Sequence, residues 1–222
     1  MIIGPEITRY RFQDLRTGNL LADNQYTNIL FSKSILHTHW PTGAEIVDVW
    51  TFGDWTPNAM TKFVNTALEI DADYLVTISS DVGWEPEAIK TLIAGDKDVA
   101  TGWALGRSHP FRLHQALKYD EERKTFSVPP TKEVRDRHGW ERIAATGGEL
   151  VVWKADVFKR IPCDWFFGDN MQHPVTGRIM TEDYYFASRA AEYGVEIWVN
   201  WDVPLAHESA GVYTFKGDLH FE

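Results

Sequence analysis

The sequence predicts a single α/β domain built around a mostly parallel central sheet. Residues 74–78 form a short apolar run without polar alternation, which is typical of a strand buried on both faces. Helical patterns lie before it at 57–70 and after it at 86–94, and such alternation of strands and helices favours parallel pairing with right-handed crossovers. With 222 residues, 44% of them apolar, the chain is long enough for one core, so we expect one domain over residues 1–222.

The two helices beside this strand have local start signals. Apolar residues recur at helical spacing in 57–70, and Thr56 precedes them as a plausible N-cap. The second helix begins with Pro86 at a first-turn position, flanked by Glu85 and Glu87, where acidic side chains favour the helix N-terminus. Both segments therefore have the features of helices that flank a central strand.

Further elements follow from hydrophobic patterns and breaker residues. The chain predicts a strand at 1–7 interrupted by Gly4 and Pro5, a loose helix at 26–40, strands at 44–52, 98–103, 143–153 and 196–199, and a helix from Thr181 to Tyr193 closed by Gly194. Segment 9–24 is too polar and irregular to assign. The charged segment 117–142 is interpreted as a loop or hairpin insertion.

Composition excludes several classes of protein. The formal net charge of −10 argues against a nucleic-acid-binding or anionic-membrane surface, because those partners favour basic patches. A single cysteine, Cys163, excludes an internal disulfide framework and a multi-cysteine zinc site. The chain has no long apolar run for a transmembrane segment, and its first residues lack the features of a signal peptide, so we expect a cytoplasmic protein.

Small oxygen-bearing side chains follow the central strand. Ser79, Ser80 and Asp81 come directly after the apolar run, and open α/β sheets bind ligands outside the carboxyl ends of their strands. Asp81 is therefore a candidate metal ligand.

These residues also carry a resemblance to a known family. The stretch from Ala67 to Val82, followed by Pro86 and Leu92, resembles the DxD region of GT-A-fold glycosyltransferases. The resemblance implies a GT-A-like, Rossmann-type α/β/α sandwich. It also implies a divalent cation, Mn²⁺ or Mg²⁺, bound by the last carboxylate of DxD and holding the diphosphate of a nucleotide-sugar. Asp81 matches that carboxylate, whereas Ser79 stands where the family has its first aspartate.

The resemblance also points to residues around the donor, with Ser79 and Ser80 among them. In the family, an asparagine on the preceding helix packs under the donor site and matches Asn65, although Val64 replaces the arginine that often accompanies it. A glycine-led strand end borders the donor sugar and matches Gly102, and Arg107 lies in the following loop, where it could contact phosphate or sugar. The alternatives are an ordinary helix-surface residue for Asn65 and a solvated charge for Arg107.

Residues on the acceptor side are implied in the same way. Gly147 and Gly148 lie shortly before the apolar run 150–153 and resemble a family segment that lines the acceptor side of the cleft; Trp165 belongs to the continuation of that pattern. The insertion at 117–142 is a further candidate to face the acceptor. For the two glycines, a simple turn or bulge is the alternative.

The sequence Thr181-Glu182-Asp183 resembles a second family motif, in which an acidic pair opens a helix and faces the acceptor. In inverting members the aspartate is the general base, which makes Asp183 and Glu182 the catalytic candidates. The alternative is structural, because acids in a first turn interact favourably with the helix dipole. That dipole also lowers the pKa of a carboxyl and weakens it as a base, so burial near the acceptor would have to offset it.

A histidine that follows the last predicted strand completes the set. His207 resembles the C-terminal metal ligand of the family and would share the cation with Asp81. One imidazole and one carboxylate leave room for diphosphate oxygens on an octahedral cation.

The leading hypothesis is a metal-dependent glycosyltransferase that moves a sugar from a nucleotide-sugar donor to a saccharide or another hydroxyl acceptor. Members of the family retain or invert configuration on the same scaffold, and the motifs are compatible with both outcomes. Two alternatives stay open: a sugar nucleotidyltransferase with similar metal-diphosphate chemistry, and a degenerate, non-catalytic saccharide-binding module. The absence of a glycine-rich, basic nucleotide-binding loop near the N-terminus argues against the nucleotidyltransferase.

Overall fold

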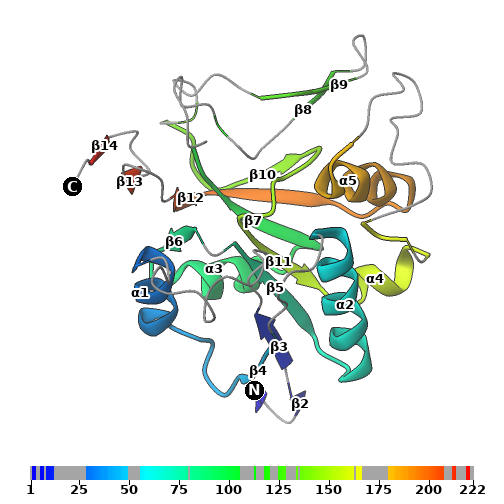
Figure 1. Ribbon diagram of the computed structural model, residues 1–222, viewed down its shortest axis with the longest axis horizontal. Coiled ribbons are helices and arrows are strands. Elements are labelled where there is room, and N and C mark those ends of the chain that lie inside the picture. The colour runs from blue at the N-terminus through cyan, green and yellow to red at the C-terminus, as the bar shows by residue number, and fades with distance from the viewer. Residues whose placement is uncertain are drawn as a thin grey trace, which may run out of the picture.

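The computed structural model of the chain is shown in Figure 1. It describes residues 2–3, 6–7, 9–12, 29–49, 56–79, 81–105, 113, 118–120, 125–128, 134, 136–162, 164–166, 180–207, 212–213 and 219–220. Among the predicted site residues, Ser80 and Arg107 lie outside the described residues, as does Cys163. No helix in the described part of the chain has the length and apolar character needed to cross a membrane.

A six-stranded sheet forms the centre of the molecule. Its strands run in the order β10 (Trp140–Ile143), β12 (Ile197–His207), β7 (Val99–Trp103), β11 (Leu150–Lys154) and β5 (Tyr74–Ile78), and β6 (Val82–Trp84) pairs with the last residues of β12. The range predicted for the central strand coincides with β5, whose residues from Leu75 onward are buried.

The prediction of a mostly parallel sheet is wrong. Of the pairings in this sheet, only β12 with β7 is parallel, whereas β11 runs antiparallel to both of its neighbours and β10 runs antiparallel to β12. Among the described elements, only the strands β8, β9 and β10 lie between β7 and its neighbour β11 in the chain, so the helix that usually forms the crossover between parallel neighbours is absent there. An apolar strand buried on both faces has the same sequence pattern whether its neighbours run parallel or antiparallel to it.

The strand directions still place several strand ends together. Because β5 and β7 are both antiparallel to β11, they run in the same direction, and β12 runs parallel to β7. The carboxyl ends of β5, β7 and β12 therefore lie at one edge of the sheet, where β11 begins. We call this edge the strand-end edge.

Helices cover the sheet on both faces, which gives the α/β/α layering expected from the sequence (Figure 1). Side chains alternate along each strand, so Leu75 and Val151 belong to one core, whereas Val76 and Val152 belong to the other. The first core contains residues of α2 (Thr56–Glu69), α4 (Val157–Arg160) and α5 (Glu182–Glu192), and the second contains residues of α1 (Ile29–His37) and α3 (Ala88–Ala94). The predicted helices at 57–70 and from Thr181 are confirmed within a residue or two at each end.

Small two-stranded sheets surround this centre. They pair β1 (Ile2–Ile3) with β2 (Glu6–Ile7), β3 (Arg9–Phe12) in parallel with β4 (Glu45–Asp48), β8 (Lys118–Asp120) with β9 (Thr125–Ser127), and β13 (Val212–Tyr213) with β14 (Leu219–His220). The β8–β9 pair confirms a hairpin within segment 117–142, whose last residues, 140–142, belong instead to β10 of the central sheet. Strand β3 lies in the segment left unassigned from sequence, although its Arg-Tyr-Arg-Phe alternation is itself a strand signal.

Strand β12 is longer than the predicted strand at 196–199. Its 11 residues include Pro204, and the pairing register with β7 shifts between Val199 and Pro204. This irregularity lets the strand tolerate a proline that has no N–H for a regular ladder. The first half of β12 pairs with β10, and its last residues pair with β6.

Candidate functional site

The strand-end edge gathers the predicted metal ligands and the glycine segment before β11. Asp81 follows β5, His207 is the last residue of β12, and Gly147 and Gly148 precede β11. Residues separated by more than a hundred positions in the chain thus meet at one edge because three strands end there and one begins there.

Asp81 is buried next to the strand that carries His207. Only 7% of Asp81 is exposed, and both of its carboxylate oxygens are shielded from solvent. In the antiparallel pairing of β6 with β12, His207 lies opposite Val82, the residue directly after Asp81. The backbone therefore brings the two predicted metal ligands into adjacent positions.

The ring of His207 is held in one orientation. The residue is 2% exposed, and its Nδ1 lies 2.7 Å from the carbonyl oxygen of Leu105, just beyond β7. Because a carbonyl oxygen can only accept, Nδ1 carries the proton in this hydrogen bond. In the neutral imidazole Nε2 then bears the lone pair, which is the arrangement that a histidine ligand of a metal requires.

Glu149 is a site residue to which sequence analysis gave no role. It lies at the start of β11, it is 3% exposed, and its Oε1 is 3.6 Å from Nε2 of His207. A Cβ atom on Gly147 would be 2.5 Å from Oε2 of Glu149, so only glycine at position 147 leaves room for this carboxylate. The sequence feature that could have pointed to Glu149 is the Gly-Gly-Glu run directly before a buried strand.

Ser79 connects β5 to the glycine segment. Its backbone N–H donates to the carbonyl oxygen of Glu149 at 2.8 Å, and its hydroxyl donates to the carbonyl oxygen of Gly148 at 3.2 Å. These bonds fix the start of β11 against the end of β5. They place Ser79 in the site as a residue that orients the backbone, and its predicted contact with the donor stays a prediction.

The predicted catalytic residues and two of the three predicted acceptor residues line one small cavity. Gly147, Gly148, Glu182 and Asp183 are among its lining residues, with Thr146, Met60, Trp153, Phe166, Phe186 and Ile197 completing the wall. The first turn of α5 thus faces the glycine segment, and the catalytic and acceptor roles of these residues stay predictions.

The pKa of Asp183 is raised to about 6, mainly because burial disfavours the charged carboxylate. Hydrogen bonds from the Thr181 hydroxyl and from the backbone N–H of Tyr184, at 2.9 Å, lower it, whereas the negative charges of Glu182 and Glu149 raise it further. Burial therefore outweighs the effect of the helix N-terminus, so the position retains the basicity that a general base needs.

Other predicted site residues have structural surroundings of their own. Asn65 is exposed on α2. A Cβ atom on Gly102 would be 2.3 Å from the carbonyl oxygen of Val203, so this glycine is required for the close packing of β7 against β12. Trp165 is 7% exposed, and its indole N–H donates to the carbonyl oxygens of Phe158 and Ile161 in the core beside α4. The donor and acceptor roles of these residues stay predictions.

The donors at the strand-end edge have the chemistry of a divalent-cation site. A carboxylate and an imidazole nitrogen suit Mn²⁺, and carboxylate oxygens suit Mg²⁺. Within the described residues, no group of three or more His, Cys, Asp or Glu side chains forms a potential metal cluster. Asp81 and His207 would therefore supply two of the ligands of a cation, and phosphate oxygens and water would complete its coordination.

Comparisons by sequence give no relative. No family profile matches the chain, and no curated protein is similar to it in sequence.

Comparisons by structure identify the fold. The chain is similar to A197 from STIV, with a TM-score of 0.60, 13% identity, and coverage of 98% of this chain and 94% of the other. It is also similar to GalNAc-T7, solved with UDP, GalNAc and Mn²⁺, with a TM-score of 0.51, 13% identity and coverage of 90% of this chain. The match spans only 44% of GalNAc-T7. At this identity, the similarity shows a GT-A-like fold and no specific activity.

A third structure, apo UDP-glucose pyrophosphorylase, matches with a TM-score of 0.49 and 8% identity, covering 96% of this chain and 94% of the other. This match is too distant to bear on the choice between a glycosyltransferase and a nucleotidyltransferase.

Proposed function

We propose that this protein is a divalent-cation-dependent glycosyltransferase that moves a sugar from a nucleotide-diphosphate-sugar to a hydroxyl acceptor. The observation that carries the proposal is the meeting of two buried ligand types at the strand-end edge. Asp81 directly precedes the residue that pairs with His207, and the His207 ring is oriented by its bond to Leu105. Burying a carboxylate is costly, and active sites are where such burial is concentrated.

Asp81 and Nε2 of His207 would hold the cation, Mn²⁺ or Mg²⁺. When bound, such a cation supplies positive charge that neutralises a diphosphate leaving group. Ser79 and Gly148 maintain the backbone beside it through their hydrogen bond. The similarity to GalNAc-T7, solved with UDP and Mn²⁺, supports this assignment at the level of the fold.

Asp183 is the residue that we assign to the acceptor proton. Its pKa of about 6 leaves it ionised at neutral pH and still basic enough to accept a proton from a hydroxyl as the new bond forms. The hydrogen bonds from Thr181 and from the backbone of Tyr184 both end on Oδ1 of this carboxylate, so we assign the proton to Oδ2. Gly147 and Gly148 face the same small cavity, and the lack of a side chain at Gly148 lets an acceptor approach closely.

The test is a panel of nucleotide-sugars incubated with Mn²⁺ or Mg²⁺ and scored for released nucleoside diphosphate. Release that depends on both the cation and an acceptor supports glycosyl transfer. Pyrophosphate release from a nucleoside triphosphate and a sugar phosphate would instead indicate a nucleotidyltransferase. Calorimetry that detected glycan binding without nucleotide or cation binding would indicate a non-catalytic saccharide-binding module.

A further inference from the structure

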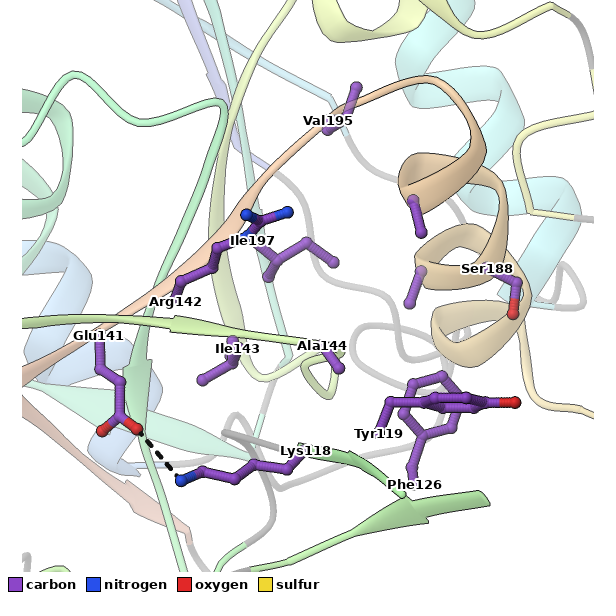
Figure 2. Close-up of a pocket in the computed structure, with 12 residues that line it drawn as sticks. Lys118, Tyr119, Phe126, Glu141, Arg142, Ile143, Ala144, Ser188, Val195 and Ile197 are labelled. Atoms are coloured by element: carbon purple, nitrogen blue, oxygen red, sulfur yellow. Dashed lines mark ion pairs between the residues drawn. The ribbon is translucent and has the colours of Figure 1, made fainter. Parts of the chain in front are cut away.

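A second, larger cavity lies between the β8–β9 hairpin, β10 and α5, and we call it the hairpin cavity. It has a volume of about 640 Å³, within the range of about 300 to 1,000 Å³ that is typical of small-molecule sites. Figure 2 shows Tyr119 and Phe126 on the hairpin, Ile143 at the end of β10, Ala144 directly after it, and Ile197 at the start of β12 around this space.

The walls of the hairpin cavity are apolar and partly aromatic. The rings of Tyr119 and Phe126 meet edge to face with centroids 5.4 Å apart and form one wall. On α5, Ala187 and Ala191 lie one turn apart and both line the cavity. Because these helix residues have small side chains, the space beside them stays open. Such walls favour the apolar body of a ligand.

The rim of the hairpin cavity carries an excess of positive charge. Lys118 lies 3.6 Å from Glu141 on the side of β10 that faces the hairpin, whereas Arg142 points to the other side of the strand and lies 3.0 Å from Glu196 (Figure 2). Glu141 also binds Arg137 at 2.7 Å, so two cations, Lys118 and Arg137, share the one carboxylate of Glu141, in a chain whose net charge is −10. This local balance is complementary to one anionic group.

Lys118 is well suited to bind such a group. Its side chain is 58% exposed, and its contact with Glu141 is longer than the one Glu141 makes with Arg137. Exposed ion pairs of this kind contribute little to stability, so Lys118 can turn to a ligand at low cost.

The hairpin cavity adjoins the small cavity that contains Asp183. Ile197 lines both cavities, and Phe126 stacks on Tyr184 with centroids 5.0 Å apart. Tyr184 directly follows Asp183 in the first turn of α5, so the two cavities share a wall.

We propose that the hairpin cavity binds an anionic amphiphile, with its apolar body between the hairpin and α5 and its anionic group at Lys118. The proposal stands on the volume, the apolar walls and the cationic rim, and it does not require that the amphiphile be the acceptor of a sugar. Binding needs neither nucleotide nor cation, so it can be tested apart from transfer.

The test is calorimetric titration of the full chain with dodecyl phosphate below its critical micelle concentration. Ala191→Phe fills the cavity from an exposed helix position, and it should weaken binding at least about tenfold, because a filled pocket cannot bury the chain. The matched control is Ala94→Phe, the same change at an exposed position of α3 away from the cavity. The control should bind as the unaltered protein does.

A second variant tests the rim. Lys118→Gln should weaken dodecyl phosphate binding several-fold and leave binding of the uncharged n-dodecyl maltoside unchanged, and inorganic phosphate alone should bind far more weakly than dodecyl phosphate. Melting temperatures would verify that each variant is folded. The proposal is overturned if dodecyl phosphate does not bind, if inorganic phosphate binds as well, or if Ala94→Phe and Ala191→Phe have equal effects.

Discussion

The strand-end edge and the hairpin cavity differ in almost every physical respect, although α5 and β12 connect them. At the strand-end edge, Asp81, Glu149 and His207 are nearly inaccessible to solvent, and the interactions there are polar. The hairpin cavity is wide and mainly apolar, and its charges stay exposed at the rim. The first region has the properties of a site for chemistry, and the second has those of a site for binding.

The difference indicates that the sheet and the insertion contribute separate functions. Strand directions and the glycine segment determine the strand-end edge, whereas the hairpin cavity depends on β8 and β9, which do not pair with the central sheet. A substitution in one region should therefore leave ligand binding in the other region unchanged, and the following experiments test that independence.

The largest effect is expected for Asp183→Asn. Loss of the general base should lower the transfer rate by about 10² to 10⁴-fold with little change in nucleotide affinity. The matched control is Asp156→Asn, an exposed aspartate at the start of α4, which should transfer at the normal rate. Near-normal transfer by Asp183→Asn would remove it from the mechanism, and Glu182→Gln, measured beside it, would show whether the neighbouring acid takes that role.

The next effect concerns Asp81→Asn, which keeps the shape of the side chain and removes its charge. Cation-dependent nucleotide affinity should fall by about 10 to 100-fold, the cost typical of weakening a metal site, and cation-independent dodecyl phosphate binding should persist. Asp73→Asn, an exposed aspartate at the opposite end of β5, is the control. Calorimetry with nucleoside diphosphate and Mn²⁺ measures both, and equal affinities for the two variants would contradict the assignment of Asp81.

The transfer rate should also depend on pH through Asp183. Since its pKa is about 6, the carboxylate becomes protonated as the pH falls below 6, and the rate should decline about tenfold for each further pH unit. Binding of the uncharged n-dodecyl maltoside over the same range provides a comparison that involves neither the base nor a ligand that titrates. A transfer profile that stayed flat between pH 7 and pH 5 would argue against Asp183 as the proton acceptor.

A smaller effect is expected for Phe126→Ala in the hairpin. It removes the edge-to-face contact with Tyr119 and the stacking on Tyr184, so dodecyl phosphate affinity should fall about 2 to 10-fold. Nucleotide affinity should stay unchanged, because the strand-end edge is built by other elements. A parallel loss of nucleotide affinity would show that the two regions are coupled.

The smallest effect is on stability. The pKa of Asp183 is raised from its ordinary value near 3.8, so the folded state binds the proton more tightly and the ionised form costs stability above pH 6. Asp183→Asn should therefore raise the free energy of unfolding at pH 8 by on the order of 1 kcal/mol, allowing for partial solvent contact. This gain should shrink as the pH falls from 6 towards 4. Chemical denaturation of the variant and of the unaltered protein at pH 8 and at pH 4 measures this difference. If the variant is the less stable of the two at pH 8, the result would favour a role of Asp183 as a first-turn acid.

Local signals predicted the elements whose patterns are strong. The apolar run of β5 and the start of α5 at Glu182 are determined by residues close in sequence, so their positions could be predicted. The direction of β11 could not, because its buried residues Leu150 to Val152 have no feature that depends on the direction of the neighbouring strands.

The site was predictable only in part for the same reason. Asp81, Asp183 and His207 stood out through motifs, whereas Glu149 resembles an ordinary acid near a turn. Its burial depends on Gly147 and on His207, which is distant in sequence. The raised pKa of Asp183 could not be predicted either, because it results mainly from burial, which residues of the first turn of α5 do not determine alone.

The missing side chain of Gly102 has a consequence for evolution of the chain. The carbonyl oxygen of Val203 occupies the space in which any other residue would place its Cβ, 2.3 Å away. Position 102 therefore cannot drift to alanine unless β12 retreats from β7, and a retreat would carry the strand's last residue, His207, away from Leu105. Selection that keeps His207 in its place would therefore also act against the substitution of Gly102 by alanine on the neighbouring strand.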